Sequence, residues 1–275
     1  MVGSPGGKRR RTLISVFAVL TLGAVSALAL VFYLRKDANP GCETGSSTMC
    51  TRVFFIGNSY TSVNDLPTVF ADLAWSGGHR VHTGVQAPGG WKLADHDTSD
   101  TGSTLSASRW NFVVLQEQSE IPSDKNLRET YMYPAAQDLV LMARNAGAEP
   151  MFFLTWAHRN GWPAYNLPDY SSMQSAIDDG YLTIAGQQHA AVAPVGYAWM
   201  SLVDRESDPG LWQDDGSHPT EKGTYLAACV FYASIFLTSP TGLNYHAGLS
   251  NADALDAQQA AATTVLGDPS KWGLP

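Results

Sequence analysis

The chain begins with one long uncharged stretch and continues with short apolar or alternating runs separated by segments of helical periodicity. The uncharged stretch covers residues 12–34, whereas the later runs are four to seven residues long. Runs of strand length that alternate with helical segments are typical of α/β domains. The pattern therefore predicts a membrane-crossing segment followed by an α/β body.

Residues 12–34 are long enough to cross a membrane. In helical form they would reach about 35 Å, compared with about 30 Å for the hydrocarbon core of a bilayer. The basic cluster at residues 8–11 outweighs Arg35 and Lys36, which favours a cytoplasmic N-terminus. We expect four segments, which are a cytoplasmic basic tail at 1–11, a transmembrane signal anchor at 12–34, a stalk at 35–50 and an extracytoplasmic domain at 51–275.

A cleaved signal peptide is the alternative for the same segment. Ala27 and Ala29 form the small-x-small pattern that precedes a cleavage site. The apolar run nevertheless continues to Leu34, whereas the apolar region of a signal peptide is usually about 7 to 15 residues long. The anchor is therefore the favoured interpretation, and secretion after cleavage stays open.

The body contains five candidate strands and four candidate helices. The strands are expected at 53–56, 80–86, 112–115, 151–155 and 192–195, and the helices at 67–75, 129–145, 171–189 and 220–237. Strands that are continuously apolar suit a parallel sheet covered by helices on both faces. We predict a three-layer α/β/α sandwich around a mostly parallel five-stranded sheet. Ligands of such sheets bind beyond the carboxyl ends of the strands.

The charge of the body argues against a nucleic-acid partner. From residue 37 onward the chain has 11 basic and 25 acidic residues, a net charge of −14. Such a surface repels a phosphate backbone. Only 15% of all residues are charged, so neutral substrates fit this surface better.

The cysteines and histidines do not predict a metal site. Cys42 and Cys50 could close a short disulfide loop in an oxidising compartment, and Cys229 lies in an apolar helical run as a buried free thiol. His79 and His82 would point to opposite faces of a strand, because side chains alternate along it.

A serine follows the first predicted strand, in the segment from Gly57 to Thr61. Gly57 permits a sharp exit from the strand, and Ser59 would then stand at the carboxyl edge of the sheet. A serine hydroxyl there could act as a nucleophile. Taken alone, the same segment also fits a simple turn or a helix N-cap.

A base that could activate this serine lies near the other end of the chain. Asp215 and His218 are three residues apart, and Gly216 between them lets the carboxylate fold back onto the imidazole. Such a pair supplies a proton acceptor and the group that orients it. Asp214 is the alternative carboxylate and His158 the alternative base, and His218 could instead be a surface residue that caps a helix.

Ester chemistry also needs hydrogen-bond donors for the oxyanion of the tetrahedral intermediate. The backbone N–H of Ser59 is one candidate. After the second strand the N–H of Gly90 is another, with Gly89 in reserve, and after the third strand the side-chain amide of Gln118 is a third.

Together these motifs resemble the SGNH hydrolase superfamily, which contains the GDSL-like esterases and lipases. The four blocks of that family correspond to residues 57–59, Gly90, residues 116–119 and residues 215–218, and the resemblance spans residues 51–238. Residues 115–119, 155–156 and 193–196 look like a divergent bacterial branch of this superfamily. The chain departs from the family pattern at Asn58, where the family has aspartate, and at Gln118, where the family has the oxyanion asparagine. The resemblance implies an SGNH or flavodoxin-like fold.

The resemblance also implies the function. We expect a serine-dependent hydrolase of carboxylic esters, in which Ser59, His218 and Asp215 form the triad and no cofactor takes part. Trp91, Trp156 and His158 would border the same edge and contact a small-molecule or glycan ester, although the tryptophans could instead only pack the loops. Two alternatives stay open, which are an acyltransferase on the same fold and a catalytically silent glycan-binding module.

Overall fold

The computed structural model describes residues 1, 3, 39, 41–42, 49–206 and 208–275. The chain divides into two compact units, Met1–Asn39 and Pro40–Pro275, and nearly all described residues belong to the second. The expected anchor, nearly all of the expected basic tail and most of the expected stalk lie outside the described residues. Within the described part of the chain, the helices do not combine the length and the hydropathy of a membrane span.

The body is built on a five-stranded sheet in which every neighbouring pair is parallel. Its strands are β1 (Cys50–Ile56), β2 (Arg80–Gln86), β3 (Phe112–Leu115), β4 (Glu149–Phe153) and β5 (Ala191–Ala193). Their order across the sheet is β2-β1-β3-β4-β5. The predicted parallel sheet is therefore confirmed, and each predicted strand overlaps an observed one.

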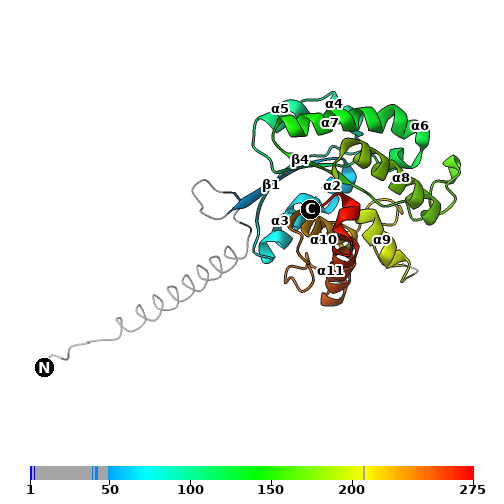
Figure 1. Ribbon diagram of the computed structural model, residues 1–275. Helices are drawn as coiled ribbons and strands as arrows, with labels where there is room; N and C mark the ends of the chain where they lie inside the picture. The colour runs from blue at the N-terminus through cyan, green and yellow to red at the C-terminus, as the bar shows by residue number, and fades with distance from the viewer. Residues whose placement is uncertain (2, 4–38, 40, 43–48, 207) are drawn as a thin grey trace. The chain divides into compact units, whose positions relative to one another are not determined.

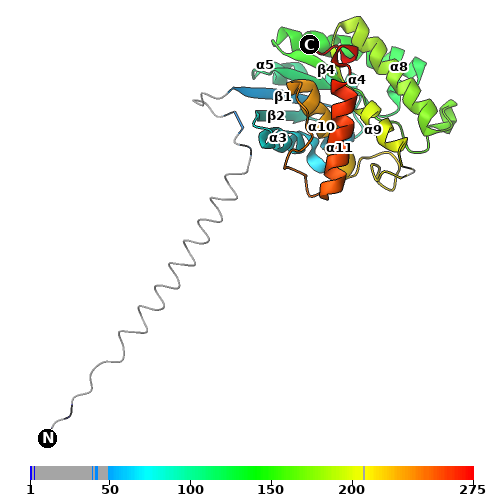
Figure 2. The same ribbon diagram turned by 60° about the horizontal axis from the view of Figure 1, so that its bottom comes forward.

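Helices cover both faces of this sheet (Figures 1 and 2). The α-helices are α2 (Ser59–Ser62), α3 (Leu66–Ser76), α4 (Leu93–Asp97), α5 (Thr101–Ser106), α6 (Lys125–Leu127), α7 (Tyr133–Asn145), α8 (Tyr170–Gln188), α9 (Val195–Val203), α10 (Glu221–Phe236) and α11 (Asn251–Leu266). On one face α7 packs against α4, α5 and α8, and on the other α10 packs against α3, α9 and α11.

The four predicted helices correspond to α3, α7, α8 and α10. The helix α7 starts at Tyr133, four residues later than predicted, because a π-helical turn occupies Arg128–Met132. The helices α9 and α11 and the short helices α2, α4, α5 and α6 are additions to the prediction.

One phenylalanine of α10 joins this helix to the strands. The ring of Phe231 meets the rings of Phe55 in β1 and Phe153 in β4 edge to face, with centroids 5.3 and 5.0 Å apart. Its side chain is 0% exposed. Cys229, two residues earlier, is a buried free thiol as expected.

The topology places the loops after β1, β2 and β3 at one edge. Ile56 pairs with Gln86 of β2 and with Leu115 of β3, so the next residue of each strand leaves the sheet at the same level. The chain also reverses its direction of winding between β1 and β3. Crevices at such reversals are the usual ligand sites of parallel sheets.

The structure joins Cys42 to Cys50 by a disulfide, which is the short loop that the sequence allows. This bond ties the segment before the sheet to the first residue of β1. Disulfides of this kind form and persist in oxidising compartments.

Replacement of Phe231 by alanine tests this account of the core. We expect Phe231→Ala to lower the free energy of unfolding by about 3 to 5 kcal/mol, since the cavity left between α10 and the sheet cannot collapse fully. Urea unfolding monitored by circular dichroism measures this. Leu255→Ala on α11, where the side chain is 42% exposed, should change the value by no more than about 0.5 kcal/mol.

Candidate active site

The turn after β1 presents Ser59 at the carboxyl edge of the sheet. Asn58 caps α2 with its side-chain Oδ1, which accepts a hydrogen bond from the N–H of Tyr60 at 3.1 Å. A Cβ at Gly57 would collide with the side chains of Gln116 and Thr61, so only glycine fits at this exit. Ser59 is half-buried and is the first residue of the helix.

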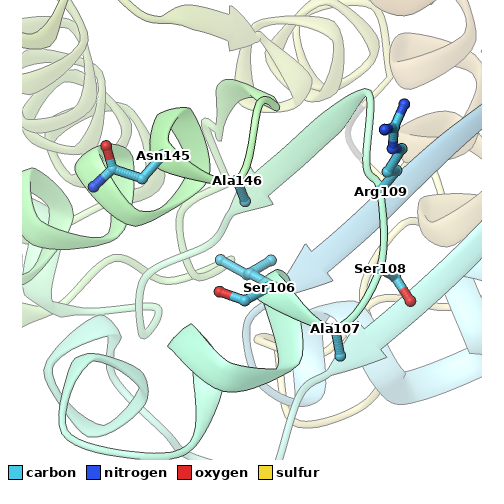
Figure 3. Close-up of a pocket in the computed structure, with 7 residues that line it drawn as sticks. Ser106, Ala107, Ser108, Arg109, Asn145 and Ala146 are labelled. Atoms are coloured by element: carbon cyan, nitrogen blue, oxygen red, sulfur yellow. The ribbon is translucent and has the colours of Figure 1, made fainter.

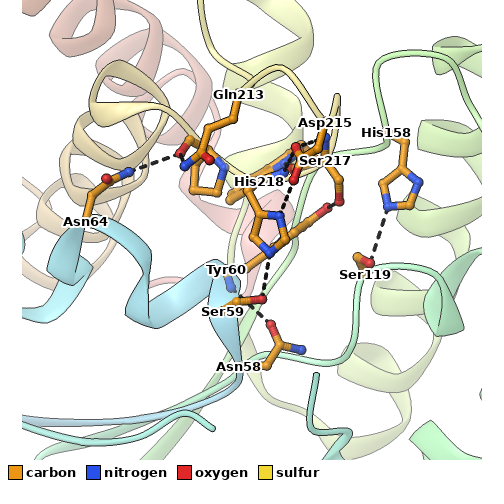
Figure 4. Close-up of polar contacts among 12 residues, drawn as sticks. Asn58, Ser59, Tyr60, Asn64, Ser119, His158, Gln213, Asp215, Ser217 and His218 are labelled. Carbon is orange, nitrogen blue, oxygen red and sulfur yellow. Dashed lines mark hydrogen bonds and ion pairs between the residues drawn. The ribbon is translucent and has the colours of Figure 1, made fainter. Parts of the chain in front are cut away.

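Ser59, His218 and Asp215 lie in series (Figure 4). The Oγ of Ser59 is 2.9 Å from Nε2 of His218, and Nδ1 of the same ring is 2.5 Å from Oδ2 of Asp215. The hydrogen-bond network assigns the tautomer, in which Nδ1–H donates to the carboxylate and Nε2 accepts from the hydroxyl. Asp214 is exposed and makes no such contact, so Asp215 is the carboxylate that reaches the ring.

The other oxygen of Asp215 shapes its own loop. Oδ1 accepts the N–H groups of Ser217 and His218, both at 2.9 Å. Partial burial would raise the pKa of this carboxyl, but the hydrogen bonds from Ser217 and His218 outweigh it, so its pKa is lowered. Asp215 is therefore ionised when it orients the imidazole.

The loop that carries His218 is docked on the helix that carries Ser59. The hydroxyl groups of Tyr60 and Ser217 lie 2.7 Å apart, and Nδ2 of Asn64 donates to the carbonyl oxygen of Pro219 at 3.0 Å. These two contacts fix the residues on either side of His218. The ring is thereby held against the serine although the two residues lie far apart in the sequence.

Trp156 helps to hold the loop that carries His218 and does not form part of a substrate-binding surface. Its indole Nε1 donates to the carbonyl oxygen of Ser217 at 2.9 Å, and its ring is stacked between Tyr60 and Trp199 at centroid distances of 4.5 and 4.1 Å. The side chain is 0% exposed. The expected contact of Trp156 with substrate is therefore wrong, because its ring offers no accessible face.

His158 and Trp91 lie at the same edge. Nε2 of His158 is 3.3 Å from Oγ of Ser119, so this histidine faces a different serine from the one that His218 contacts. Burial lowers the pKa of His158. Trp91 is half-buried, and its ring meets His96 at 4.9 Å.

Two backbone donors remain available beside Ser59. Within the described part of the chain, the N–H groups of Ser59 and Gly90 have no hydrogen-bond acceptor. Gly90 has φ of 75°, a conformation that suits glycine. Nδ2 of Asn58 donates to the carbonyl oxygen of Trp91 at 2.9 Å and so joins the Gly90 loop to the serine turn.

Gln118 differs from its expected orientation. Its Oε1 accepts the N–H groups of Glu120 and Ile121 at 2.9 and 3.2 Å, which ties the side chain to its own loop. Its Nε2 lies 3.3 Å from Oγ of Ser119. The extra methylene of glutamine, compared with asparagine, lets the amide fold back in this way. The expected oxyanion contact of Gln118 is therefore corrected to a contact within its own loop.

The hollow shown in Figure 3 lies at the opposite end of the sheet. It is lined by residues 105–109, which precede β3, and by Asn145 and Ala146, which precede β4. The candidate active site instead lies beyond the carboxyl ends of the strands. Among the described residues, no group of three or more His, Cys, Asp or Glu side chains is placed to hold a metal ion.

Several solved structures are similar to this chain. A protein from Slackia heliotrinireducens, with the description "a putative SGNH hydrolase", is 26% identical, and the match covers 68% of this chain and 100% of that one with a TM-score of 0.59. A DUF4886 family protein from Bacteroides uniformis is 19% identical over 79% of this chain and 95% of its own, with a TM-score of 0.70. An acetyl xylan esterase is 12% identical, and the match covers 67% of this chain and 99% of that one with a TM-score of 0.55. No protein-family model and no curated protein matches the chain.

The sheet order, the serine at its carboxyl edge and the likeness to the Slackia protein agree. The chain belongs to the SGNH hydrolase superfamily. The resemblance carried by the four sequence motifs is thereby confirmed. Within this superfamily fold, the structure brings Ser59, His218 and Asp215 together and leaves the Ser59 and Gly90 N–H groups free, while Trp156 and Gln118 take other positions.

A buried carboxyl behind the SGNH site escaped the sequence reasoning. Glu117 is 0% exposed, and its Oε1 accepts the N–H groups of Gln118 and Leu93 at 2.6 and 3.1 Å. Its Oε2 has no partner among the described residues. Burial raises the pKa of Glu117 to about 7, although the two backbone hydrogen bonds act in the other direction. Its sequence signal is a glutamate two residues after an apolar strand.

Glu117 should make stability depend on pH. The pKa of its carboxyl rises from 4.5 in the unfolded chain to about 7 in the folded protein, so the stabilisation that its proton provides is present below about pH 4.5 and is lost as pH rises through about 7. We expect the unfolding free energy of wild type to fall relative to Glu117→Gln by up to about 3 kcal/mol between pH 5 and pH 8.

Urea unfolding of both proteins across this pH range measures the difference. Glu149→Gln, at an exposed position, is the matched control, and its unfolding free energy should change with pH in the same way as that of wild type. A constant difference between wild type and Glu117→Gln would show that Glu117 does not keep its proton in the folded state.

Proposed function

We propose that the protein is a serine-dependent hydrolase of carboxylic esters. The observation that carries this proposal is the series of contacts from Ser59 Oγ through His218 to Asp215. Fold relatives with esterase in their names add support at the level of the superfamily.

The geometry suits acyl transfer in two steps. Ser59 Oγ attacks the ester carbonyl while Nε2 of His218 takes the hydroxyl proton, and the imidazolium then gives this proton to the departing alkoxide. Asp215 stabilises the imidazolium. Water next attacks the acyl-enzyme, His218 accepts its proton and returns it to Ser59, and the carboxylic acid is released.

Two backbone N–H groups are assigned to the oxyanion. Within the part of the chain that the structure describes, neither the N–H of Ser59 nor that of Gly90 has an acceptor. Each such donor contributes on the order of 3 kcal/mol to lowering the barrier. Gln118 has no place in this assignment, because its amide is bonded within its own loop.

The substrate is proposed to be a small-molecule or glycan ester. Trp91 and His158 are both half-buried near the serine, and they offer one aromatic surface and one hydrogen-bonding ring. Small neutral acyl groups such as acetyl suit a body with a net charge of −14, since anionic acyl chains would be repelled.

The body is proposed to work outside the cytoplasm, tethered by residues 12–34. Support comes from the uncharged length of that segment and from the basic cluster before it. The disulfide between Cys42 and Cys50 is also of the kind that persists in an oxidising compartment.

The function is tested on the full chain in detergent with acetyl, butyryl and octanoyl p-nitrophenyl esters and with a fluorophosphonate probe. We expect hydrolysis, and covalent labelling that disappears in Ser59→Ala. We expect His218→Ala to lower kcat by about 10⁴-fold or more, because the serine loses its base. Ser108→Ala, in the hollow at the other end of the sheet, should match wild type. A wild type that neither hydrolyses these esters nor labels would indicate a silent binding module.

The two neighbouring aspartates provide a second test. Asp215→Ala should lower kcat by about 10⁴-fold, since the imidazole loses both its orientation and its counter-charge. Asp214→Ala should keep wild-type activity, because Asp214 is exposed and makes no contact with the ring. Equal losses in the two variants would contradict the assignment of Asp215.

A further inference from the structure

Both ends of the side-chain amide of Asn58, the residue before the nucleophile, form hydrogen bonds. The side chain of Asn58 is 2% exposed. Its Oδ1 accepts the N–H of Tyr60 at 3.1 Å and Nε2–H of Gln116 at 2.9 Å, and its Nδ2 donates to the carbonyl oxygen of Trp91 at 2.9 Å. A single buried amide therefore contacts the serine helix, the end of β3 and the loop after β2.

Gln116 fixes the orientation of this amide. Its Oε1 accepts the backbone N–H of Asn58 and the hydroxyl of Thr61, both at 2.9 Å, so its Nε2 must face Oδ1 of Asn58. Because Oδ1 also receives the N–H of Tyr60, Nδ2 of Asn58 must point to Trp91. Neither amide can flip without bringing two donors together.

This arrangement sets the distance between the two oxyanion donors. Ser59 follows Asn58 directly, and Gly90 directly precedes Trp91. The hydrogen bond from Asn58 to Trp91 thus joins the residue beside one donor to the residue beside the other. Among the residues that the structure describes, the other backbone hydrogen bond of the Gly90 turn runs from the N–H of Trp91 to the carbonyl oxygen of Pro88, at 3.2 Å.

We propose that Asn58 is a positioning residue, whose side-chain amide holds the Gly90 N–H in register with the Ser59 N–H through its hydrogen bond to Trp91. The inference rests on the proposed esterase function. An ionised aspartate, the residue usual at this position in the superfamily, would fail here, because it has no hydrogen to donate and would place a negative charge against the Trp91 carbonyl.

The test is Asn58→Asp in the full chain, assayed on p-nitrophenyl acetate from pH 5.5 to 8. At pH 8 we expect kcat to fall by about 100-fold, since a displacement near 1 Å costs about that much, with KM changed by less than about 3-fold. At pH 5.5 the ratio of variant to wild-type kcat should recover by about 10-fold, because the protonated carboxyl can donate to Trp91.

Variant and wild type are compared as a ratio at each pH, because both proteins contain the same other ionisable groups near Asn58 and Ser59. These groups are His96 in α4, Glu117 after β3, Tyr60 in α2, and Asp215 and His218 in the loop before α10. Circular dichroism at each pH reports whether the variant is folded. Asn145→Asp, an exposed amide-to-acid change at the other end of the sheet, should leave kcat unchanged at every pH.

A folded Asn58→Asp variant with wild-type kcat, or with a loss that does not depend on pH, would overturn the proposal. If Asn58→Asp does not fold, Asn58→Ala is measured instead. We expect this variant to lose about 10- to 100-fold in kcat at all pH values. A wild-type kcat in Asn58→Ala would overturn the proposal. If wild type shows neither hydrolysis nor fluorophosphonate labelling, the esterase function itself fails and the positioning role with it.

Discussion

The candidate site depends on the docking of one loop onto one helix. Ser59 and His218 are separated by 159 positions in the chain, and the hydrogen bond between them exists only while the loop before α10 stays seated. Two groups hold Ser217, which precedes the histidine, because the hydroxyl of Tyr60 meets its Oγ and the indole of Trp156 donates to its carbonyl. Since both anchoring rings are buried and stacked on each other, the loop is held by packing as well as by polar contacts.

The parallel sheet makes this docking possible. Strands of equal register end at one level, so the serine turn, the Gly90 loop and the residues after β3 meet without long connections. The reversal of winding between β1 and β3 keeps helices away from that point. Catalytic side chains can therefore lie at the edge, while the sheet and its covering helices supply the rigidity.

Predictions from the sequence were correct where a local pattern of residues determines the structure. The apolar strands, the helices α3, α7, α8 and α10, and the spacing of Asp215 and His218 each have a local pattern in the sequence, and the structure contains each of them. The helix α11 was missed because its buried positions are mostly alanines, such as Ala254, Ala257 and Ala261, which carry little hydrophobic periodicity. A helix face made of alanines can pack closely against its neighbours, but it produces little hydrophobic contrast along the sequence.

Properties that depend on distant partners could not be predicted in this way. A tryptophan after a strand can face solvent or the core, and Trp156 is buried because Tyr60 and Trp199 lie on its two faces. Gln118 likewise turns inward because two N–H groups of its own loop are available to it. The pairing of Asn58 with Gln116 required knowledge of both ends of a contact that spans 58 positions.

That pairing has an electrostatic consequence for the proposed reaction. Negative charge develops on the oxyanion beside Ser59, and at low dielectric a nearby carboxylate would raise the energy of that state. The polar groups directly behind the serine are the neutral amides of Asn58 and Gln116. Glu117 is the buried carboxyl nearest to them in sequence, and with its pKa raised to about 7 it keeps its proton for much of the time near neutral pH. The ionised Asp215 lies on the far side of the His218 ring, where its charge stabilises the imidazolium and not the ester.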